Sequence, residues 1–181
     1  GDDVLEAGIE ILPVMPPPPP LDAVKDAPQI AASLRAATGA PTRLAWVQGT
    51  NFERYTSSSS QVIIMGLDTE DGLGERPILS EPGPYSNPLF TADGKRLVFS
   101  NRATLQVHVI DWDGENRRDL GPGDASEVWR DPGTGIDWVY LRSQGGRSDD
   151  PIVRRQVDNP KIEESVWNRT PNGHADLPWF Q

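Results

Sequence analysis

The sequence predicts an all-β protein made of repeated four-stranded antiparallel units, preceded by an extended proline-rich N-terminal arm and one short helix. Three observations lead to this expectation. Short apolar runs alternate with turns rich in Gly and Asp. Gly and Pro are frequent, with 17 and 18 copies in 181 residues, and they lie between these runs. The same succession of runs and turns also returns along the chain.

The N-terminal arm, residues 1–41, contains no copy of the repeated pattern. Its proline run, Pro16 to Pro20, can adopt only the polyproline II conformation and so forms a stiff spacer. Apolar residues before the prolines have no repeat to pack against, so we expect them to contact a protein partner. The predicted contacts in the arm are Leu5, Ile9, Ile11, Pro16, Pro17 and Pro18. The alternative is that the arm folds back over an open edge of its own repeats.

One helix is predicted at the end of the arm, from Pro28 to Thr38. Ile30, Leu34 and Ala37 recur at helical spacing within it. Gly39 follows as a typical helix terminator.

The repeats occupy the rest of the chain, residues 42–181. The predicted units lie near 42–80, 87–120 and 125–168, with the start of another at 175–181. One apolar marker strand recurs, which we align as Leu44–Val47, Leu97–Ser100 and Trp138–Leu141. A second and a third run follow each marker strand, at 61–67 and 76–80, 106–112 and 117–120, and 151–157 and 162–167. Four short strands at this period are typical of β-propeller blades.

A leading strand with an aromatic residue near its end opens each later unit, in SNPLFTADGK, ASEVWRDPGTG and HADLPWFQ. Hairpin turns at Asp93-Gly94 and Asp131-Pro132-Gly133 are expected to join leading and marker strands. Gly supplies the positive φ that such turns need, and Asp accepts bonds from the neighbouring backbone.

The stretch NPLFTADGKRLVFSN, followed by LQVHVIDWDGENRRDL, resembles the repeat of TolB-like propellers in the WD-type β-propeller group. The shared features are a Pro-x-aromatic strand, an Asp-Gly turn, an apolar strand ending in Phe-Ser and a further apolar strand closing on Asp-Gly. The resemblance is close over 87–120, partial over 125–167 and weaker over 42–80. It implies a partial or truncated β-propeller and a periplasmic or extracellular location.

The repeats do not amount to a closed propeller. The first unit has no leading strand, and Gln181 falls inside the leading strand of a fourth unit. Three units are fewer than the 4–8 blades that typically close a propeller. We therefore expect either further residues beyond Gln181 or a partner that covers the open edge.

Composition disfavours several classes of function. The formal net charge of -10 argues against nucleic acid, whose phosphates are bound by clustered Lys and Arg. No run reaches the roughly 20 apolar residues of a membrane span, although a membrane protein is one candidate partner. Because Cys is absent, thiolate metal sites and Cys nucleophiles are excluded.

No cofactor, metal ligand or catalytic residue is predicted, and we do not expect an enzyme. The motif DWDGEN imitates the start of a calcium loop. Asn116 and Pro122, however, stand where an EF-hand needs Gly and a bidentate Glu. The common nucleophile, phosphate-loop and zinc motifs do not occur in the sequence.

Aromatic residues supply the remaining candidates. Trp112 closes a strand beside an acidic turn. Core is the favoured position for it, and an exposed indole that contacts a partner or stacks on a sugar is the alternative. The residues expected between blades are Val98, Phe99, Trp46, Trp129, Trp138, Trp167 and Trp179. His108 is expected on a blade face, and His174 is either structural or functional near a central channel.

These expectations favour a non-catalytic protein-interaction or accessory subunit, a propeller scaffold that docks on a larger extracytoplasmic or membrane-associated complex. One alternative is a propeller that binds carbohydrate or a small ligand through Trp and acidic residues. A second alternative is part of a propeller hydrolase whose catalytic part lies beyond Gln181.

Overall fold

The computed structural model describes residues 27–49, 61–142 and 151–167 of the chain. The arm contacts predicted from the sequence lie outside these ranges; they are Leu5, Ile9, Ile11, Pro16, Pro17 and Pro18. His174 and Trp179 lie outside them too.

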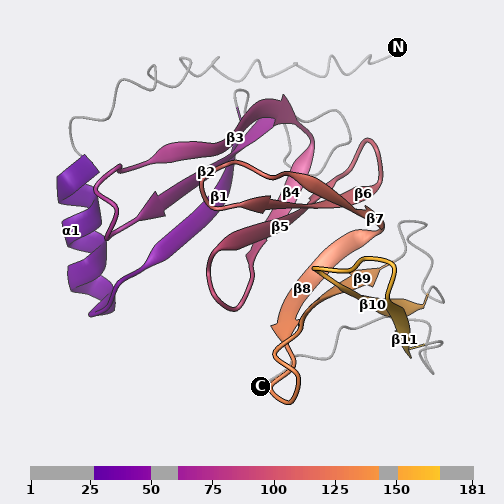
Figure 1. The fold of residues 1–181 in the computed structure, drawn as a ribbon. Helices are drawn as coiled ribbons and strands as arrows, with labels where there is room; N and C mark the ends of the chain where they lie inside the picture. The colour runs from indigo at the N-terminus through magenta and orange to yellow at the C-terminus, as the bar shows by residue number, and fades with distance from the viewer. Residues whose placement is uncertain (1–26, 50–60, 143–150, 168–181) are drawn as a thin grey trace, which may run out of the picture.

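One helix and three antiparallel sheets make up the described residues (Figure 1). Helix α1 spans Ala27–Thr38. Sheet 1 contains β1 (Arg43–Gly49), β2 (Val62–Asp68) and β3 (Arg76–Gly83), in that order. Sheet 2 contains β4 (Tyr85–Phe90), β5 (Arg96–Asn101), β6 (Gln106–Asp111) and β7 (Arg118–Pro122). Sheet 3 contains β8 (Asp124–Arg130), β9 (Asp137–Arg142), β10 (Ile152–Gln156) and β11 (Glu163–Trp167).

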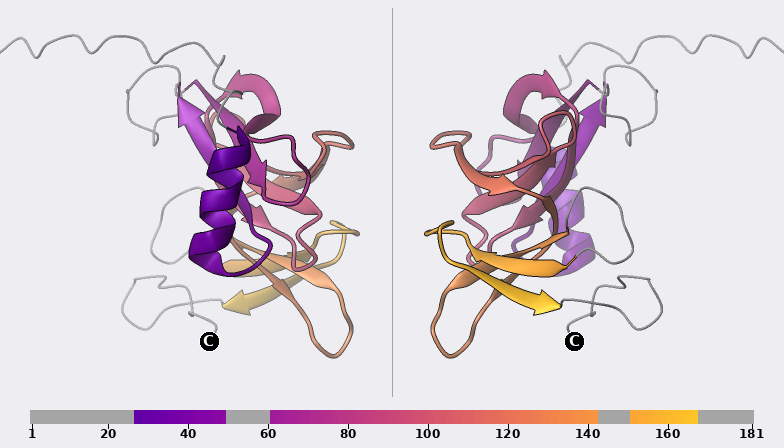
Figure 2. Two further views of the ribbon diagram at one scale, coloured as in Figure 1. Left: turned by 90° about the vertical axis from the view of Figure 1, so that its left-hand side faces the viewer. Right: turned by 90° about the vertical axis from the view of Figure 1, so that its right-hand side faces the viewer.

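This architecture confirms the predicted partial propeller. In each four-stranded sheet the strands pair in chain order, so each sheet is one meander, as in a propeller blade. Sheet 1 has three strands, which confirms that the first unit has no leading strand among the described residues. The predicted helix is also confirmed; it flanks the first sheet at the end of the stack (Figure 2). Within the described ranges, the structure contains no helix with the length and apolarity needed to cross a bilayer.

Two apolar clusters fasten the sheets into one stack. Leu97 and Phe99 on β5 pack against Ile64 and other residues of sheet 1. Val98, which points to the opposite face of β5, packs with Val139 on β9. Val98 and Phe99 are both 0% exposed, so the prediction that they lie between blades is confirmed.

The structure corrects the alignment of the third unit by one residue. The turns that begin at Thr91 and Asp131 have equal length, since these N–H groups donate to the carbonyls of Arg96 and Ile136, at 3.0 and 2.9 Å. Asp137, and not Trp138, is therefore the counterpart of Leu97.

A shift of one residue reverses the face to which every side chain of a strand points. Trp138 is accordingly buried on the face of sheet 3 turned away from sheet 2, with Tyr140 and Ile152. It was expected between blades, and in this respect the alignment was wrong. Trp46 and Trp129, expected in the same kind of core, are half-buried.

Trp112 lies in the core, the position that the sequence favoured over an exposed one. It is 8% exposed and belongs to the cluster between sheets 1 and 2. Gly66 on β2 leaves room for it, since a Cβ there would lie 2.6 Å from Cη2 of Trp112. The guanidinium groups of Arg43 and Arg76 lie 5.5 and 5.2 Å from the ring centroid. The core position is therefore confirmed over the exposed alternative, whereas a part for Trp112 in partner binding stays a prediction.

The expected hairpin turns are present, with one difference. Gly94 has a φ of 68°, and Asp93 accepts a bond from the N–H of Lys95 at 3.0 Å. In the turn after β8 the positive φ belongs to Gly135, at 71°, rather than to Gly133. Asp131 accepts the bond from the N–H of Gly133 at 2.8 Å, as expected of a turn aspartate.

Candidate functional site

The turns that follow the first and third strands of each meander lie at the same end of a sheet, because neighbouring strands are antiparallel. We call this end of the stack the turn face. On it, the N–H of Trp112 in the β6–β7 turn donates to the carbonyl of Lys95 in the β4–β5 turn, at 2.8 Å. The charged residues of the turns therefore gather on one side of the molecule.

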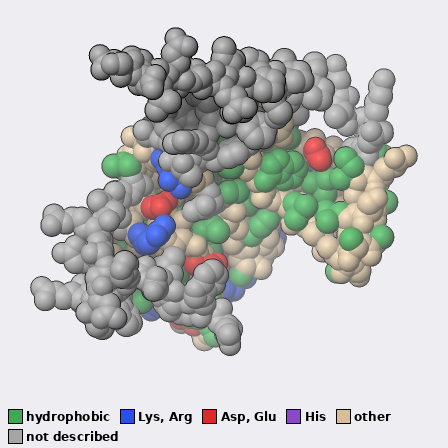
Figure 3. Space-filling model, turned by 180° about the vertical axis from the view of Figure 1, so that it is seen from behind, with side chains coloured by type: hydrophobic (Ala, Val, Ile, Leu, Met, Phe, Trp, Pro, Cys, Tyr) green, Lys and Arg blue, Asp and Glu red, His purple; other side chains and the backbone are tan. Residues whose placement is uncertain are grey.

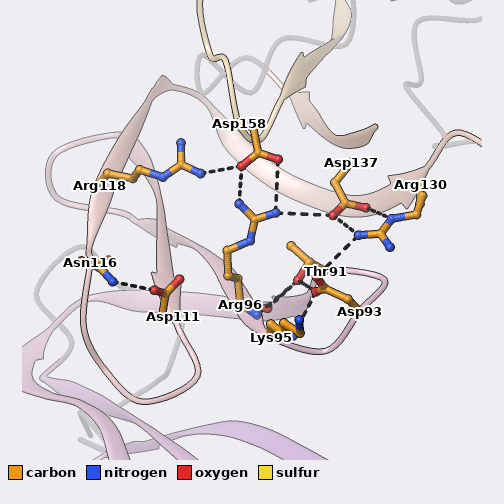
Figure 4. A network of polar contacts seen from close by, with 10 residues as sticks. All are labelled: Thr91, Asp93, Lys95, Arg96, Asp111, Asn116, Arg118, Arg130, Asp137 and Asp158. Carbon is orange, nitrogen blue, oxygen red and sulfur yellow. Dashed lines mark hydrogen bonds and ion pairs between the residues drawn. The ribbon is translucent and has the colours of Figure 1, made fainter. Parts of the chain in front are cut away.

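An ionic network on the turn face joins sheet 2 to sheet 3 (Figure 4). Arg96 at the start of β5 donates to both oxygens of Asp158, in the β10–β11 turn. Arg118 at the start of β7 donates to the same carboxylate at 3.0 Å. Arg130 at the end of β8 makes a bidentate contact with Asp137, at 2.8 and 2.7 Å.

Asp137 is the buried member of this network. Its side chain is 1% exposed and occupies the position that Leu97 has in sheet 2. A buried carboxylate needs compensating partners. It has them in Arg130 and, from the neighbouring sheet, in Arg96, whose Nη2 lies 3.6 Å away. An ion pair therefore joins sheets 2 and 3 at the same strand position where the apolar side chain of Leu97 joins sheets 1 and 2.

The network also keeps its exposed carboxylates charged. The pKa of Asp158 lies below its ordinary value, chiefly because Arg96 donates a hydrogen bond to it, while burial acts in the opposite direction. The pKa of Asp93 is also lowered. There burial would raise it, but it is outweighed by bonds from Lys95 and Thr91 and by the charges of Arg130 and Arg96.

Sequence reasoning missed this network, although a signal was present. Arg43 and Arg96 each begin a marker strand and pair in register with an aspartate, Asp68 and Asp111. Arg43 also crosses to the next sheet, donating to the carbonyl of Gly94 at 2.7 Å. An arginine at this repeat position thus fastens one sheet to the turn of the following sheet, twice in succession.

A recess of about 550 Å³ opens on the turn face. It is lined by Arg43, Asp93, Lys95, Arg96, Asp111, Trp112, Asp113 and Asp158. Both signs of charge are present, and among the described residues no Ser, Thr, His or Cys side chain lines it. The lowered pKa values leave Asp93 and Asp158 anionic near neutral pH, which does not suit a general acid. The recess is therefore better suited to holding a polar ligand than to acid–base chemistry.

His108 lies on β6, on the blade face expected from the sequence. Its Nδ1 is 3.5 Å from an oxygen of Asp119, and its ring lies 5.4 Å from that of Phe99. Burial, followed by the nearby charge of Arg117, holds the pKa of His108 below its ordinary value, against the opposing charge of Asp119. None of these contacts places His108 beside a nucleophile.

A second candidate site is the open edge of sheet 1. β1 pairs with β2 over its whole length, whereas its counterparts β5 and β9 have a neighbour on both sides. The N–H of Thr42 donates to Oγ1 of Thr69, and its carbonyl accepts from the N–H of Thr69, at 2.9 and 3.1 Å. Backbone groups alternate along a strand, so those of Arg43, Ala45 and Val47 point away from β2. No described residue pairs with them there.

The other sheet edges in the described part of the chain carry features that hinder pairing with another strand. These features are Pro77 and Pro82 in β3, Pro88 in β4, Pro122 in β7, Asp124 and Glu127 in β8, and Glu163 and Glu164 in β11. The sequence of β1, RLAWVQG, contains no proline and one charged residue. Prolines and charges are the usual protection of an edge strand, so β1 is the edge best suited to accept a further strand.

Similarity to known proteins is found at the level of structure. No protein-family model matches the chain, and no curated protein sequence matches it. A protein assigned as TolB from Agrobacterium tumefaciens has a similar structure, with a TM-score of 0.46 at 15% identity. The match covers 68% of this chain and 45% of that chain. The acylaminoacyl peptidase of Pyrococcus horikoshii matches with a TM-score of 0.45 at 15% identity, over 70% of this chain and 23% of that chain.

The chain thus spans less than half the length of either protein. The four-stranded meanders of sheets 2 and 3 agree with the TolB-like propeller resemblance noted in the sequence.

Proposed function

We propose that the protein is a non-catalytic interaction subunit whose propeller-type stack joins a larger assembly through the open edge of sheet 1. The single observation that carries this proposal is β1, a seven-residue strand that pairs on one side only among the residues that the structure describes. A strand added to such an edge gains main-chain hydrogen bonds, and its alternate side chains set the specificity.

The side chains of β1 support this use of the edge. Leu44 is 43% exposed and Trp46 is half-buried, on the face turned away from sheet 2. Ala45 and Val47 pack against the core between sheets 1 and 2, so the strand is held firmly from behind. An incoming strand would find a fixed backbone template together with an apolar surface.

Two substitutions block the edge without touching the β2 ladder. Ala45→Pro removes an N–H that points away from β2, a place where proline is tolerated in an edge strand. Leu44→Lys puts a charge at the exposed position beside the edge, and Leu73→Lys is its control, because Leu73 is 60% exposed in a turn outside β1.

The test is co-purification of the tagged chain and its variants from the native source, with thermal melting to verify folding. We expect partner polypeptides with the wild type and Leu73→Lys and their loss with Ala45→Pro and Leu44→Lys. Recovery of the same polypeptides with all four folded proteins would refute the proposal. The proposal also includes a location outside the cytoplasm, which fractionation of the native cells tests.

A second candidate function is binding of a carbohydrate or other polar small ligand in the recess of the turn face. The specific observation in its favour is the lining, which combines Trp112 with carboxylates and with Lys95. Lys95 is exposed at this position. Glycan-array binding that is lost in Lys95→Ala and Asp113→Asn would support this candidate, and binding that survives both changes would count against it.

A further inference from the structure

The recess on the turn face contains two opposite charges that no other described residue neutralises. Lys95 is exposed, and neither a hydrogen bond nor an ion pair engages its ammonium group within the described ranges. Asp113 is exposed too. Its Oδ1 accepts from the N–H of Glu115 at 3.0 Å, which leaves Oδ2 without a partner among the described residues. Both side chains line the recess, so one cation and one carboxylate are available there to a ligand.

These two residues lie on neighbouring turns whose backbones are bonded together. The carbonyl of Lys95 accepts from the N–H of Trp112 at 2.8 Å, and Asp113 follows Trp112 in the chain. The bond holds the β4–β5 turn against the β6–β7 turn, and so fixes the points from which the two side chains extend. Yet the two charged groups form no ion pair with each other, so both are open to a bound molecule.

Other charged groups of the recess already have partners within the protein. Arg96 donates to both oxygens of Asp158, and Asp111 accepts from Nδ2 of Asn116 at 2.7 Å (Figure 4). Arg43 is held by a carboxylate of β2 and by a carbonyl of the β4–β5 turn, at 2.6 and 2.7 Å. These bonds fix the walls of the recess, so recognition of a ligand falls to the two groups that have no partner.

We infer that the recess binds a small zwitterion, a molecule with one carboxylate and one ammonium group such as a free amino acid or a dipeptide. Lys95 receives the carboxylate, and Asp113 receives the ammonium group. The inference rests on the second candidate function, for which it names the class of ligand, and it makes no use of the edge of β1.

The charges of the recess favour a zwitterion over a ligand with a single charge. Seven of the eight described residues that line it are charged, three of them cationic and four anionic. An anion held by Lys95 alone would face the carboxylates without compensation, and a cation held by Asp113 alone would face the cationic side chains. A zwitterion presents each of its ends to the opposite charge.

The lining disfavours three other classes of ligand. Within the described ranges, no three His, Asp or Glu side chains come together in a way that could hold a metal ion. A sugar ring stacked on Trp112 needs an open indole face, but this ring is 8% exposed and the guanidinium groups of Arg43 and Arg76 lie 5.5 and 5.2 Å from its centroid. An apolar ligand would find little here, because hydrophobic side chains gather instead toward the side where α1 and sheet 1 lie (Figure 3).

The volume of the recess and one buried donor agree with a zwitterion. The recess measures about 550 Å³, within the range of about 300–1,000 Å³ typical of small-molecule sites. Trp112 lines it, and Nε1 of this indole is buried with no acceptor among the described residues. An unpaired buried donor is costly, and a carboxylate held by Lys95 brings an acceptor to the same wall.

The test is calorimetric titration of the 181-residue chain with defined probes. The probes are the common amino acids and glycylglycine, with glucose as a neutral sugar. Each zwitterion that binds is compared with its N-acetyl form, which lacks the ammonium group, and with its amide, which lacks the carboxylate. We expect at least one zwitterion to bind, and each of its two blocked forms to bind at least about tenfold more weakly, because each has lost a charged hydrogen bond.

Two variants assign the ends of the ligand. Lys95→Gln should lose the preference for the zwitterion over its amide, and Asp113→Asn should lose the preference over the N-acetyl form. Glu115→Gln and Lys161→Gln are the matched controls, because each removes a charge of the same sign from an exposed residue in a turn of this face, outside the lining of the recess. Both controls should bind like the wild type, and thermal melting verifies that all four variants fold.

Three results would overturn the inference: no binding by any zwitterion of the panel, equal binding of the blocked forms, or variants at Lys95 and Asp113 that bind like the controls. If glycan-array binding is lost in Lys95→Ala and Asp113→Asn while no zwitterion binds, the second candidate function stands and this inference alone fails. If neither class of ligand binds, both fail. The edge of β1 is tested separately with Ala45→Pro, so none of these results bears on the interaction subunit.

Discussion

Truncation of Phe99 tests how sheets 1 and 2 pack against each other. The side chain is 0% exposed, and its ring centroid lies 5.4 Å from those of Tyr85 and His108. Phe99→Ala removes these contacts and leaves a cavity between the sheets. The cost for a buried Phe is about 3–5 kcal/mol of the free energy of unfolding.

The assay is thermal unfolding followed by calorimetry. At about 2–4 °C per kcal/mol for a chain of this size, Phe99→Ala should lower the Tm by about 6–20 °C. Phe99→Leu keeps most of the volume and should cost less. Leu73→Ala is the control, since Leu73 is 60% exposed and its truncation should leave the Tm within about 2 °C. If Phe99→Ala has the same Tm as Leu73→Ala, the packing of β5 against sheet 1 is refuted.

Four further predictions concern charge, pH, metal and the arm. Asp137→Ala should lower the free energy of unfolding by about 3 kcal/mol, because the Asp137 side chain is 1% exposed. Asp158→Ala should lower it by about 1 kcal/mol at most, because the Asp158 side chain is 67% exposed. Equal losses of free energy in urea unfolding would contradict this difference in burial. Because the pKa of His108 is lowered in the folded protein, its contribution to stability is present above about pH 6.5 and is lost as pH falls below that value. His108→Gln should therefore make the Tm fall less steeply between about pH 7 and 5.5. The lowered pKa values of Asp93 and Asp158 place their titration below this range. The same dependence of Tm on pH in the variant and the wild type would contradict the prediction for His108. A chelator should leave the Tm unchanged. A sharp fall of the Tm would instead indicate that the acidic turns bind calcium. Deletion of residues 1–20 should release a bound partner while the Tm is kept; loss of Tm with the partner still bound would contradict a partner-binding arm.

The sequence by itself determined the class of the fold and the position of most elements. Alternating apolar runs have a period of two, and turns need Gly or Asp at fixed places, so both leave marks in the sequence. The hairpin at Asp93 and Gly94, the helix before the repeats and the burial of Val98 and Phe99 all followed from such marks. The missing leading strand of the first unit was visible for the same reason.

Only the tertiary structure decided which faces meet and which charges pair. A buried Asp137 interrupts the apolar pattern of β9, and the sequence alignment therefore took Trp138 in its place. The partners that make its burial tolerable come from β8 and from the neighbouring sheet, contacts that no local pattern encodes. The sequence left a core and an exposed position open for Trp112, because its burial depends on space left by Gly66 on another sheet. Long-range packing sets the environment of such residues, so their exposure and their charge partners become known only when the sheets are stacked.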